Sequence, residues 1–301
     1  MRILVLGGTG YLGRHVTRRL RALRGAQILV AGRRARDGFR ADLATDAPER
    51  LAKTLAAAAP DAVVNCAGAT GGDAVTLAEV NARGPAALCA ALREAAPGAR
   101  LVHLGSAAEY GPGMPGSPVT EAAPACPVTP YGATKLAGTV AVRTSALDGV
   151  VLRVGNPVGP GAPAASLPGR MVVLLRTADR DPGAVLRLGD LSAYRDFVDV
   201  RDVADAVALA VTATGPLPSV LNIGGGTAVP VRELVRGLAR RAGFRGRLEE
   251  DGAGSARSAQ VSWQCSDITA AGRAVGWRPA HGLDDALDAL WAAGADDGRT
   301  P

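Results

Sequence analysis

The stretch GGTGYLG, residues 7–13, decides the fold because it separates a short apolar run from an amphipathic segment. Residues 2–6 (RILVL) are predicted to form a buried strand, and residues 13–23 a helix with its apolar side chains on one side. Glycines in this turn allow close backbone approach, so the helix N-terminus can bind a pyrophosphate. An ordinary strand-to-helix turn could also use them, but their position favours a dinucleotide. The expected cofactor-binding residues of this loop are Gly7, Thr9, Gly10, Tyr11, Leu12 and Gly13.

The same alternation of strand and helix continues along the chain. Short apolar runs at residues 27–31, 62–65, 101–105 and 150–153 each follow a stretch rich in Ala, Leu and Arg. Strands separated by helices indicate a parallel sheet that is covered on both faces. We therefore predict an α/β fold, a Rossmann-type doubly wound parallel sheet.

The pattern changes after about residue 155, where several prolines precede a predicted helix at residues 171–178. Two more helices are predicted at 231–242 and 283–292. We predict a dinucleotide-binding Rossmann domain over residues 1–155. Residues 156–301 are predicted to form mainly a smaller substrate-binding lobe, interleaved with the last strands of the sheet.

Composition excludes several classes of function. The net charge is +6, but the arginines are scattered and aromatic residues make up only 3%, too few for a base-stacking surface, so no nucleic-acid partner is expected. The four cysteines show no CxxC spacing and the three histidines do not cluster with them, so no metal site is expected. The apolar run at the N-terminus is too short for a signal peptide or a membrane span, which predicts a cytoplasmic protein without a membrane partner.

The end of the second predicted strand bears on the choice of cofactor. An acidic residue there usually binds the ribose 2′-hydroxyl of NAD. This sequence reads LVAGRRAR at residues 29–36, with Gly32 at the expected acidic position and Arg33 and Arg34 after it. Guanidinium groups suit a 2′-phosphate, so NADP is favoured over NAD, although arginines are common throughout this chain.

The segment PYGATK places Tyr131 and Lys135 four residues apart, on one face of a predicted helix. The chain has only two lysines and four tyrosines, so chance explains this pair poorly. A nearby ammonium favours the phenolate and lowers the pKa of a phenol from its ordinary value of about 10. Tyr131 could then exchange a proton with a carbonyl or hydroxyl oxygen while a nicotinamide exchanges hydride at the attached carbon. Ser106, at the end of another predicted strand, could bind the same oxygen, or it could satisfy loop backbone groups.

Together these motifs resemble the extended short-chain dehydrogenase/reductase family, in particular its NAD(P)-dependent sugar-nucleotide epimerase/dehydratase group. The resemblance covers nearly the whole chain. It rests on GGTGYLG (7–13), Asp42 and Leu43, NCAG (65–68), LGSAAEYG (104–111), PYGATK (130–135), LRVGNPVGPG (152–161), YRDFVDVRDVA (194–204), LNIGGGTAVPVREL (221–234) and GWRP (276–279).

The resemblance implies roles for individual residues. Ser106, Tyr131 and Lys135 look like the catalytic triad of the family, and Lys135 would also hold the nicotinamide ribose. Arg195 matches the arginine that usually binds the substrate diphosphate, and Arg257 matches a second one only weakly, because RSAQ replaces its usual surroundings. Further cofactor contacts are implied for Asp42, Leu43, Asn65, Cys66, Ala67, Gly68, Asn81 and Val158, and a substrate contact for Asn156.

The pair that follows Ser106 narrows the reaction. In the 4,6-dehydratases of the family, the hydroxyl residue precedes an Asp and a Glu, whereas this chain has Ala107 and Ala108. A methyl group cannot carry a proton, so elimination of water lacks its acid and base. The favoured function is NADPH-dependent reduction of a nucleotide-linked 4-keto sugar or a similar ketone. Alternatives are NAD-dependent 4-epimerisation and a non-catalytic NADP-binding redox sensor. A homodimer through the helices that carry the Tyr-Lys pair is possible.

Overall fold

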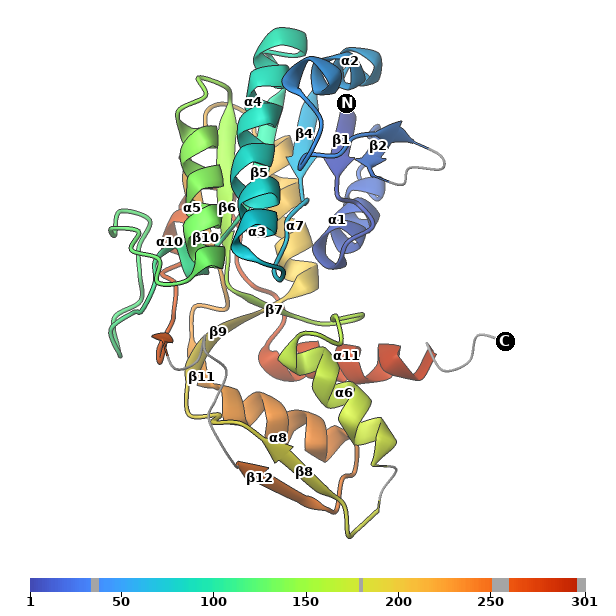
Figure 1. Ribbon diagram of the computed structural model, residues 1–301, viewed down its shortest axis with the longest axis vertical. Coiled ribbons are helices and arrows are strands. Elements are labelled where there is room, and N and C mark those ends of the chain that lie inside the picture. Colours follow the sequence, from blue (N-terminus) through green and yellow to red (C-terminus); the bar gives the residue numbers. More distant parts are fainter. Residues whose placement is uncertain (34–37, 179–180, 251–259, 297–301) are drawn as a thin grey trace.

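The computed structural model describes residues 1–33, 38–178, 181–250 and 260–296. Its centre is a seven-stranded parallel sheet with the order β10-β6-β5-β4-β1-β2-β3 (Figure 1). The order reverses between β1 and β4, and in open α/β sheets such a point is where ligands bind, beyond the carboxyl ends of the strands. The strands are β1 (Arg2–Leu6), β2 (Gln27–Gly32), β3 (Phe39–Arg40), β4 (Ala62–Asn65), β5 (Arg100–Ser106), β6 (Gly149–Val154) and β10 (Val220–Ile223).

Helices cover both faces of this sheet. The helices α1 (Tyr11–Arg21), α7 (Val200–Thr212) and α10 (Thr269–Val275) pack on one face. The other face carries α2 (Pro48–Ala58), α4 (Gly84–Ala95) and α5 (Pro130–Arg143). Two-sided burial explains why the strands are apolar at successive positions instead of alternating: Ile3, Leu4 and Val5 are all fully buried. The predicted doubly wound sheet is confirmed.

The C-terminal half builds a second body below the sheet (Figure 1). Its strands form a three-stranded sheet, β11-β9-β7, and a pair, β12-β8. An apolar cluster that includes Met171, Leu234, Leu238 and Leu287 lies among its helices. These elements are β7 (Asn156–Val158), α6 (Leu167–Thr177), β8 (Val185–Leu188), β9 (Tyr194–Asp199), β11 (Ala228–Pro230), α8 (Val231–Arg241), β12 (Arg247–Glu250) and α11 (Leu283–Asp296).

Both α7 and β10 come from this half of the chain and yet complete the main sheet and its covering layer. The C-terminal body is therefore connected to the sheet by several chain crossings. Within the described part of the chain, every helix falls short of the length and apolarity that crossing a membrane requires.

Candidate active site

The glycine loop between β1 and α1 has the backbone that a bound pyrophosphate requires. Gly7 has φ +73°, and a Cβ there would lie 2.7 Å from the backbone nitrogen of Ala67. A Cβ on Gly13 would collide with the carbonyl oxygen of Gly7. The N-cap of α1 is Gly10, no side chain caps this helix, and its first turn has no acidic residue. The N-terminus of α1 can therefore bind an anion with its backbone N–H groups.

Side chains from the same end of α1 bind the loop that follows β7. The Tyr11 hydroxyl donates to the Gly159 carbonyl oxygen at 3.3 Å, and His15 Nε2 lies 3.0 Å from the Pro160 carbonyl oxygen. Arg14 donates to the carbonyl oxygen of Gly161. Desolvation and the charge of Asp199 raise the pKa of Tyr11 well above its usual value, so its hydroxyl stays protonated and remains a donor. The predicted cofactor loop is thus joined to the loop that follows β7.

The segment after β4 links the glycine loop to Lys135. The Asn65 Oδ1 accepts from the Ala67 backbone at 3.0 Å, which shapes the turn. A Cβ on Gly68 would lie 3.9 Å from Lys135 Nζ and 3.4 Å from Asn81 Oδ1. Asn81 in turn binds both backbone groups of Ala69, at 2.9 Å and 2.8 Å. Residues predicted from three separate motifs therefore meet at one place.

Cys66 lies in this segment. Desolvation raises the pKa of its thiol to about 12, even though the Lys135 charge acts in the opposite direction. A thiol with so high a pKa carries little thiolate at neutral pH, so Cys66 is a packing residue and not a nucleophile.

The predicted triad lies where β5 ends and α5 begins. Ser106 is the last residue of β5 and is 7% exposed, and its Oγ accepts from the Ala108 backbone at 3.2 Å. Tyr131 is half-buried in the first turn of α5, which Thr129 caps. A Cβ on the next residue, Gly132, would lie 2.5 Å from the carbonyl oxygen of Ala108, so glycine lets α5 approach the turn after Ser106.

Lys135 is 5% exposed, and its Nζ donates to the Leu104 carbonyl oxygen at 2.5 Å. Desolvation lowers its pKa to about 8, while the charge of Glu109 acts to raise it. Lys135 is therefore charged at neutral pH and close to its titration range, where its charge is sensitive to its neighbours.

The turn η2 (Ala107–Glu109) contains an acid that sequence reasoning passed over. Glu109 is fully buried, its Oε1 accepts from the Ser106 backbone at 2.8 Å, and its Oε2 accepts from Arg153 Nε at 2.8 Å. Both carboxylate oxygens are therefore engaged inside the protein. Glu109 does not replace the dehydratase acid, and the positions that carry the acid and base of a dehydratase hold the methyl groups of Ala107 and Ala108. The spacing Ser-x-x-Glu is a capping-box pattern and was the available signal.

The predicted substrate contacts Asn156 and Arg195 lie in the second body, together with a residue that the sequence did not indicate, Gln264. Asn156 Nδ2 lies 3.5 Å from Gln264 Oε1, and Gln264 Nε2 donates to the Ala107 carbonyl oxygen at 2.8 Å. Arg195 is 4% exposed and donates to the Tyr194 carbonyl oxygen at 2.8 Å. Val158 is buried in the lobe core, so its backbone is what it can offer a cofactor. The predicted contact Arg257 lies outside the described residues.

The adenosine side is more open. Arg33 is exposed directly after β2, and Arg34 lies outside the described residues. Asp42 accepts from the Ala44 backbone at 3.0 Å, while the carbonyl oxygen of the buried Leu43 accepts from Arg83 at 3.2 Å. These contacts fix the segment after β3 at the carboxyl ends of the strands, where the glycine loop also lies.

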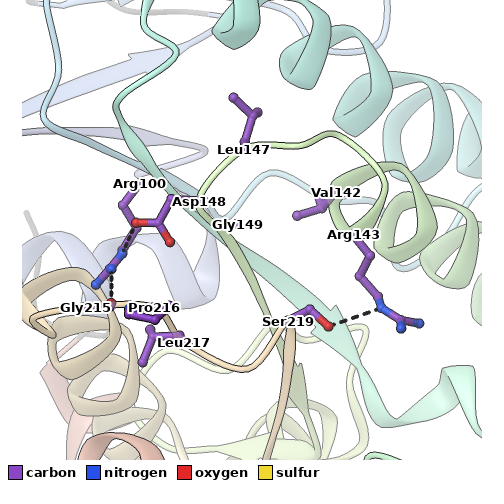
Figure 2. A pocket seen from close by; sticks show the side chains of 10 residues that line it. All are labelled: Arg100, Val142, Arg143, Leu147, Asp148, Gly149, Gly215, Pro216, Leu217 and Ser219. Atoms are coloured by element: carbon purple, nitrogen blue, oxygen red, sulfur yellow. Dashed lines mark hydrogen bonds and ion pairs between the residues drawn. The ribbon is translucent and has the colours of Figure 1, made fainter.

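A surface hollow lies near the amino-terminal ends of β5 and β6, at the end of the sheet opposite to this site, and does not belong to it (Figure 2). Arg100 begins β5 there, six residues before Ser106, and binds Asp148 at 2.8 Å. Its remaining donors bind the carbonyl oxygens of Ala210, Ala213 and Gly215. Arg100 is therefore occupied in holding the C-terminal end of α7, and we assign the hollow no ligand.

Residues 3–224 match the NAD dependent epimerase/dehydratase family. The chain belongs to this family. A curated relative from Kitasatospora kifunensis, dTDP-6-deoxy-L-talose 4-dehydrogenase (NAD(P)(+)), is 40% identical over 97% of this chain and 95% of its own length. The predicted family and the prediction of an NAD(P)-dependent enzyme are therefore confirmed.

Solved structures of the epimerase/dehydratase family share the whole fold. The RMD protein from Pseudomonas aeruginosa, complexed with NADPH, has a TM-score of 0.85 at 24% identity and covers 98% of this chain and 99% of its own. The UDP-glucose 4-epimerase of Thermus thermophilus, in complex with NAD, has a TM-score of 0.80 at 27% identity and covers 97% of this chain and 98% of its own. Members with this fold therefore bind either dinucleotide.

Proposed function

We propose that this protein is an NADPH-dependent ketoreductase that reduces the 4-keto group of a nucleotide-diphosphate-linked deoxysugar. The observation that carries the proposal is a site with the serine, tyrosine and lysine of hydride chemistry but with Ala107 and Ala108 where elimination needs an acid and a base. The 40% identical relative, a dTDP-6-deoxy-L-talose 4-dehydrogenase, supports both the 4-position and a deoxysugar substrate.

The residues present fit the dinucleotide. The pyrophosphate would bind at the uncapped N-terminus of α1 and the Gly7 turn, and the nicotinamide ribose would lie beside Lys135 and Gly68. The remaining contacts would come from Asp42, Leu43, Asn81 and the backbone at Val158. When bound, the reduced nicotinamide supplies the hydride.

Tyr131 is the proposed proton donor to the carbonyl oxygen of the substrate. The adjacent Lys135 ammonium stabilises the phenolate that remains after this transfer, and solvent returns the proton. The Ser106 hydroxyl holds the same oxygen and its developing charge. One hydride and one proton convert the ketone into an alcohol, so these side chains need no further acid or base.

The preference for NADP over NAD is also part of the proposal. Gly32 removes the carboxylate that would repel a 2′-phosphate, and the exposed guanidinium of Arg33 lies at the end of β2. A reductase that exchanges its cofactor in each cycle can draw on NADPH.

On the substrate side, Arg195 is the proposed ligand of the diphosphate, since guanidinium groups pair well with phosphate oxygens. Asn156 and Gln264 lie close to each other and next to the carbonyl of Ala107, on the side from which a sugar would reach Ser106. The cytoplasmic location and the homodimer stay predictions.

The 4-epimerase is kept as the second candidate because the same three side chains would serve it and a 27% identical structural neighbour is a UDP-glucose 4-epimerase. An epimerase retains its cofactor and returns the hydride to the other face of the same carbon. The two activities therefore differ in net consumption of the cofactor.

The test is incubation of the purified protein with NADPH or NADH and a panel of dTDP- and UDP-linked 4-keto-6-deoxy sugars, following the absorbance of the reduced nicotinamide. Oxidation of NADPH in proportion to alcohol formed is the expected result. Interconversion of the corresponding 4-hydroxy sugars, supplied with NAD and without net change in reduced nicotinamide, would instead support the epimerase. Binding of NADPH with no turnover of any sugar would support the redox sensor and reject the proposal.

A further inference from the structure

A buried ion pair between Glu109 and Arg153 lies next to the proposed triad. The side chains of Glu109 and Arg153 are 0% and 4% exposed, and Arg153 Nε lies 2.8 Å from Glu109 Oε2. Arg153 is the last residue but one of β6, and its guanidinium lies 4.4 Å from the ring centroid of Tyr110. Tyr110 is itself held by a 2.8 Å hydrogen bond from its hydroxyl to Asn222 on β10.

This pair is connected to the triad in two ways. The second oxygen of Glu109 accepts from the Ser106 backbone N–H at 2.8 Å, and the Ser106 Oγ accepts from the next turn, so the serine is fixed from both sides. In addition, the Glu109 charge acts on Lys135, whose Nζ binds the carbonyl of Leu104 on the same strand. The Glu109 carboxylate therefore accepts a hydrogen bond from the backbone of Ser106, and its charge favours the charged form of Lys135.

Stability alone explains this arrangement poorly. Burying two opposite charges costs desolvation that their attraction often only balances, and apolar residues of similar volume are often as stable in such a place. The pair is connected to two of the three residues whose positions matter to the reaction, which points to function.

We propose that the Glu109–Arg153 ion pair is a positioning device for the reaction: it fixes Ser106 toward the substrate oxygen and keeps a negative charge beside the Lys135 ammonium. This inference rests on the proposed function, because it assumes the roles given there to Ser106, Tyr131 and Lys135. Glu109 itself does not touch the substrate, since both of its oxygens face protein donors.

The ionisable groups around Lys135 define what loss of the carboxylate would do. Glu109 faces it from η2, Cys66 from the segment after β4, and His103 from β5. Burial and the Lys135 charge hold the pKa of His103 well below its usual range, so this imidazole is neutral. Cys66 is a protonated thiol. Glu109 is therefore the anion that keeps Lys135 charged, and its removal favours the neutral amine.

The experiment compares wild-type protein with Glu109→Gln in steady-state reduction of the 4-keto sugar over a range of pH. We expect kcat to fall about 10²-fold, as for other small displacements of reacting groups. KM and the Kd of NADPH should change less than about threefold. The fall of kcat at alkaline pH should move to lower pH by about one unit, because Lys135 loses its proton more easily.

Two further variants separate charge from position and protect the test against misfolding. Glu109→Asp keeps the charge on a shorter side chain, so its alkaline limb should stay in place while kcat falls. The double variant Glu109→Gln/Arg153→Met leaves no unpaired buried charge and should fold. It should nevertheless show the same loss of kcat and the same displaced limb.

The matched control is Arg100→Gln, which breaks a partly buried ion pair at the other end of β5. It should lower thermal stability and leave the pH profile unchanged. Wild-type kcat and an unmoved alkaline limb in both Glu109→Gln and the double variant would overturn the inference, as would an equal effect in Arg100→Gln. Inactivity of the wild-type protein on every sugar would instead reject the proposed function.

Discussion

Lys135 Nζ lies 2.5 Å from the carbonyl oxygen of Leu104, two residues before Ser106 on β5. The hydrogen bond joins the helix that carries Tyr131 to the strand that carries Ser106. The ammonium therefore has a structural role between two elements in addition to its proposed role beside the cofactor. The predictions below separate these roles.

Tyr131→Phe removes the proposed proton donor and little else. Turnover should fall at least about 10²-fold, the usual contribution of a positioned acid, while NADPH binding measured by fluorescence stays close to wild type. The control is Tyr194→Phe, which removes a phenolic hydroxyl from a side chain that is 41% exposed, and it should keep its activity. Full turnover by Tyr131→Phe would reject the assigned acid.

The charge of Lys135 should appear in the pH dependence. Desolvation lowers its pKa to about 8. The ammonium is therefore the main form at neutral pH, and the amine is the main form above about pH 8. Reduction should therefore slow as the pH rises through about 8. Lys135→Met should lose this alkaline limb together with most of kcat, and it should weaken NADPH binding, since the proposed ribose ligand is gone. An unchanged limb in Lys135→Met would assign the titration to another group.

The choice of cofactor can be tested at Gly32, where a Cβ would meet nothing within 4 Å. Gly32→Asp should therefore fold, and its carboxylate should repel the 2′-phosphate. We expect the preference for NADPH over NADH, measured as a ratio of kcat/KM values, to fall at least about tenfold. Gly32→Ala adds volume without charge and should keep the wild-type ratio. Equal ratios in wild type and Gly32→Asp would show that another residue sets the preference.

Asp196 should make stability depend on pH. It is fully buried and accepts from the backbones of Gly226 and Ser266, both at 3.0 Å. Desolvation outweighs these bonds and raises its pKa from 3.8 to about 6. Because the folded pKa exceeds the unfolded one, the stabilisation is complete below about pH 4 and is lost as the pH rises to about 6.

The resulting decrease in the free energy of unfolding is about 3 kcal/mol between those limits. It is measured as the difference between wild type and Asp196→Asn in urea titrations across this range. The variant should be less stable than wild type throughout, since an amide cannot accept at both positions, but it should lack this slope. A difference that does not vary with pH would contradict the assigned shift.

Much of the fold followed from local sequence pattern. Two-sided burial made the strands apolar at successive positions, so β1 and β4 have the bounds that were predicted. Helix α5 carries both Tyr131 and Lys135, as their spacing indicated. The position of Ser106 at the end of β5 agrees with the rule that open parallel sheets place their ligands beyond the carboxyl ends of the strands.

What the sequence did not indicate are contacts between residues far apart in the chain. The sequence did not distinguish Arg153 from the other arginines of the chain, because its partner Glu109 lies 44 residues away on another element. Gln264 reaches Ala107 across 157 residues. Asp202 lies in the first turn of α7, and it also binds His281 at 2.7 Å. Pairings of this kind depend on tertiary packing, which periodicity does not contain.

Three neighbouring carbonyl groups, on Gly159, Pro160 and Gly161, are held by Tyr11, His15 and Arg14 from the first two turns of α1. These hydrogen bonds thus join the N-terminus of α1 to the start of the C-terminal body. The proposed reductase would exchange its dinucleotide in every cycle, and we expect this exchange to require that several of these hydrogen bonds break. We expect weaker hydrogen bonds here to shorten the residence time of the bound cofactor without changing the proposed triad.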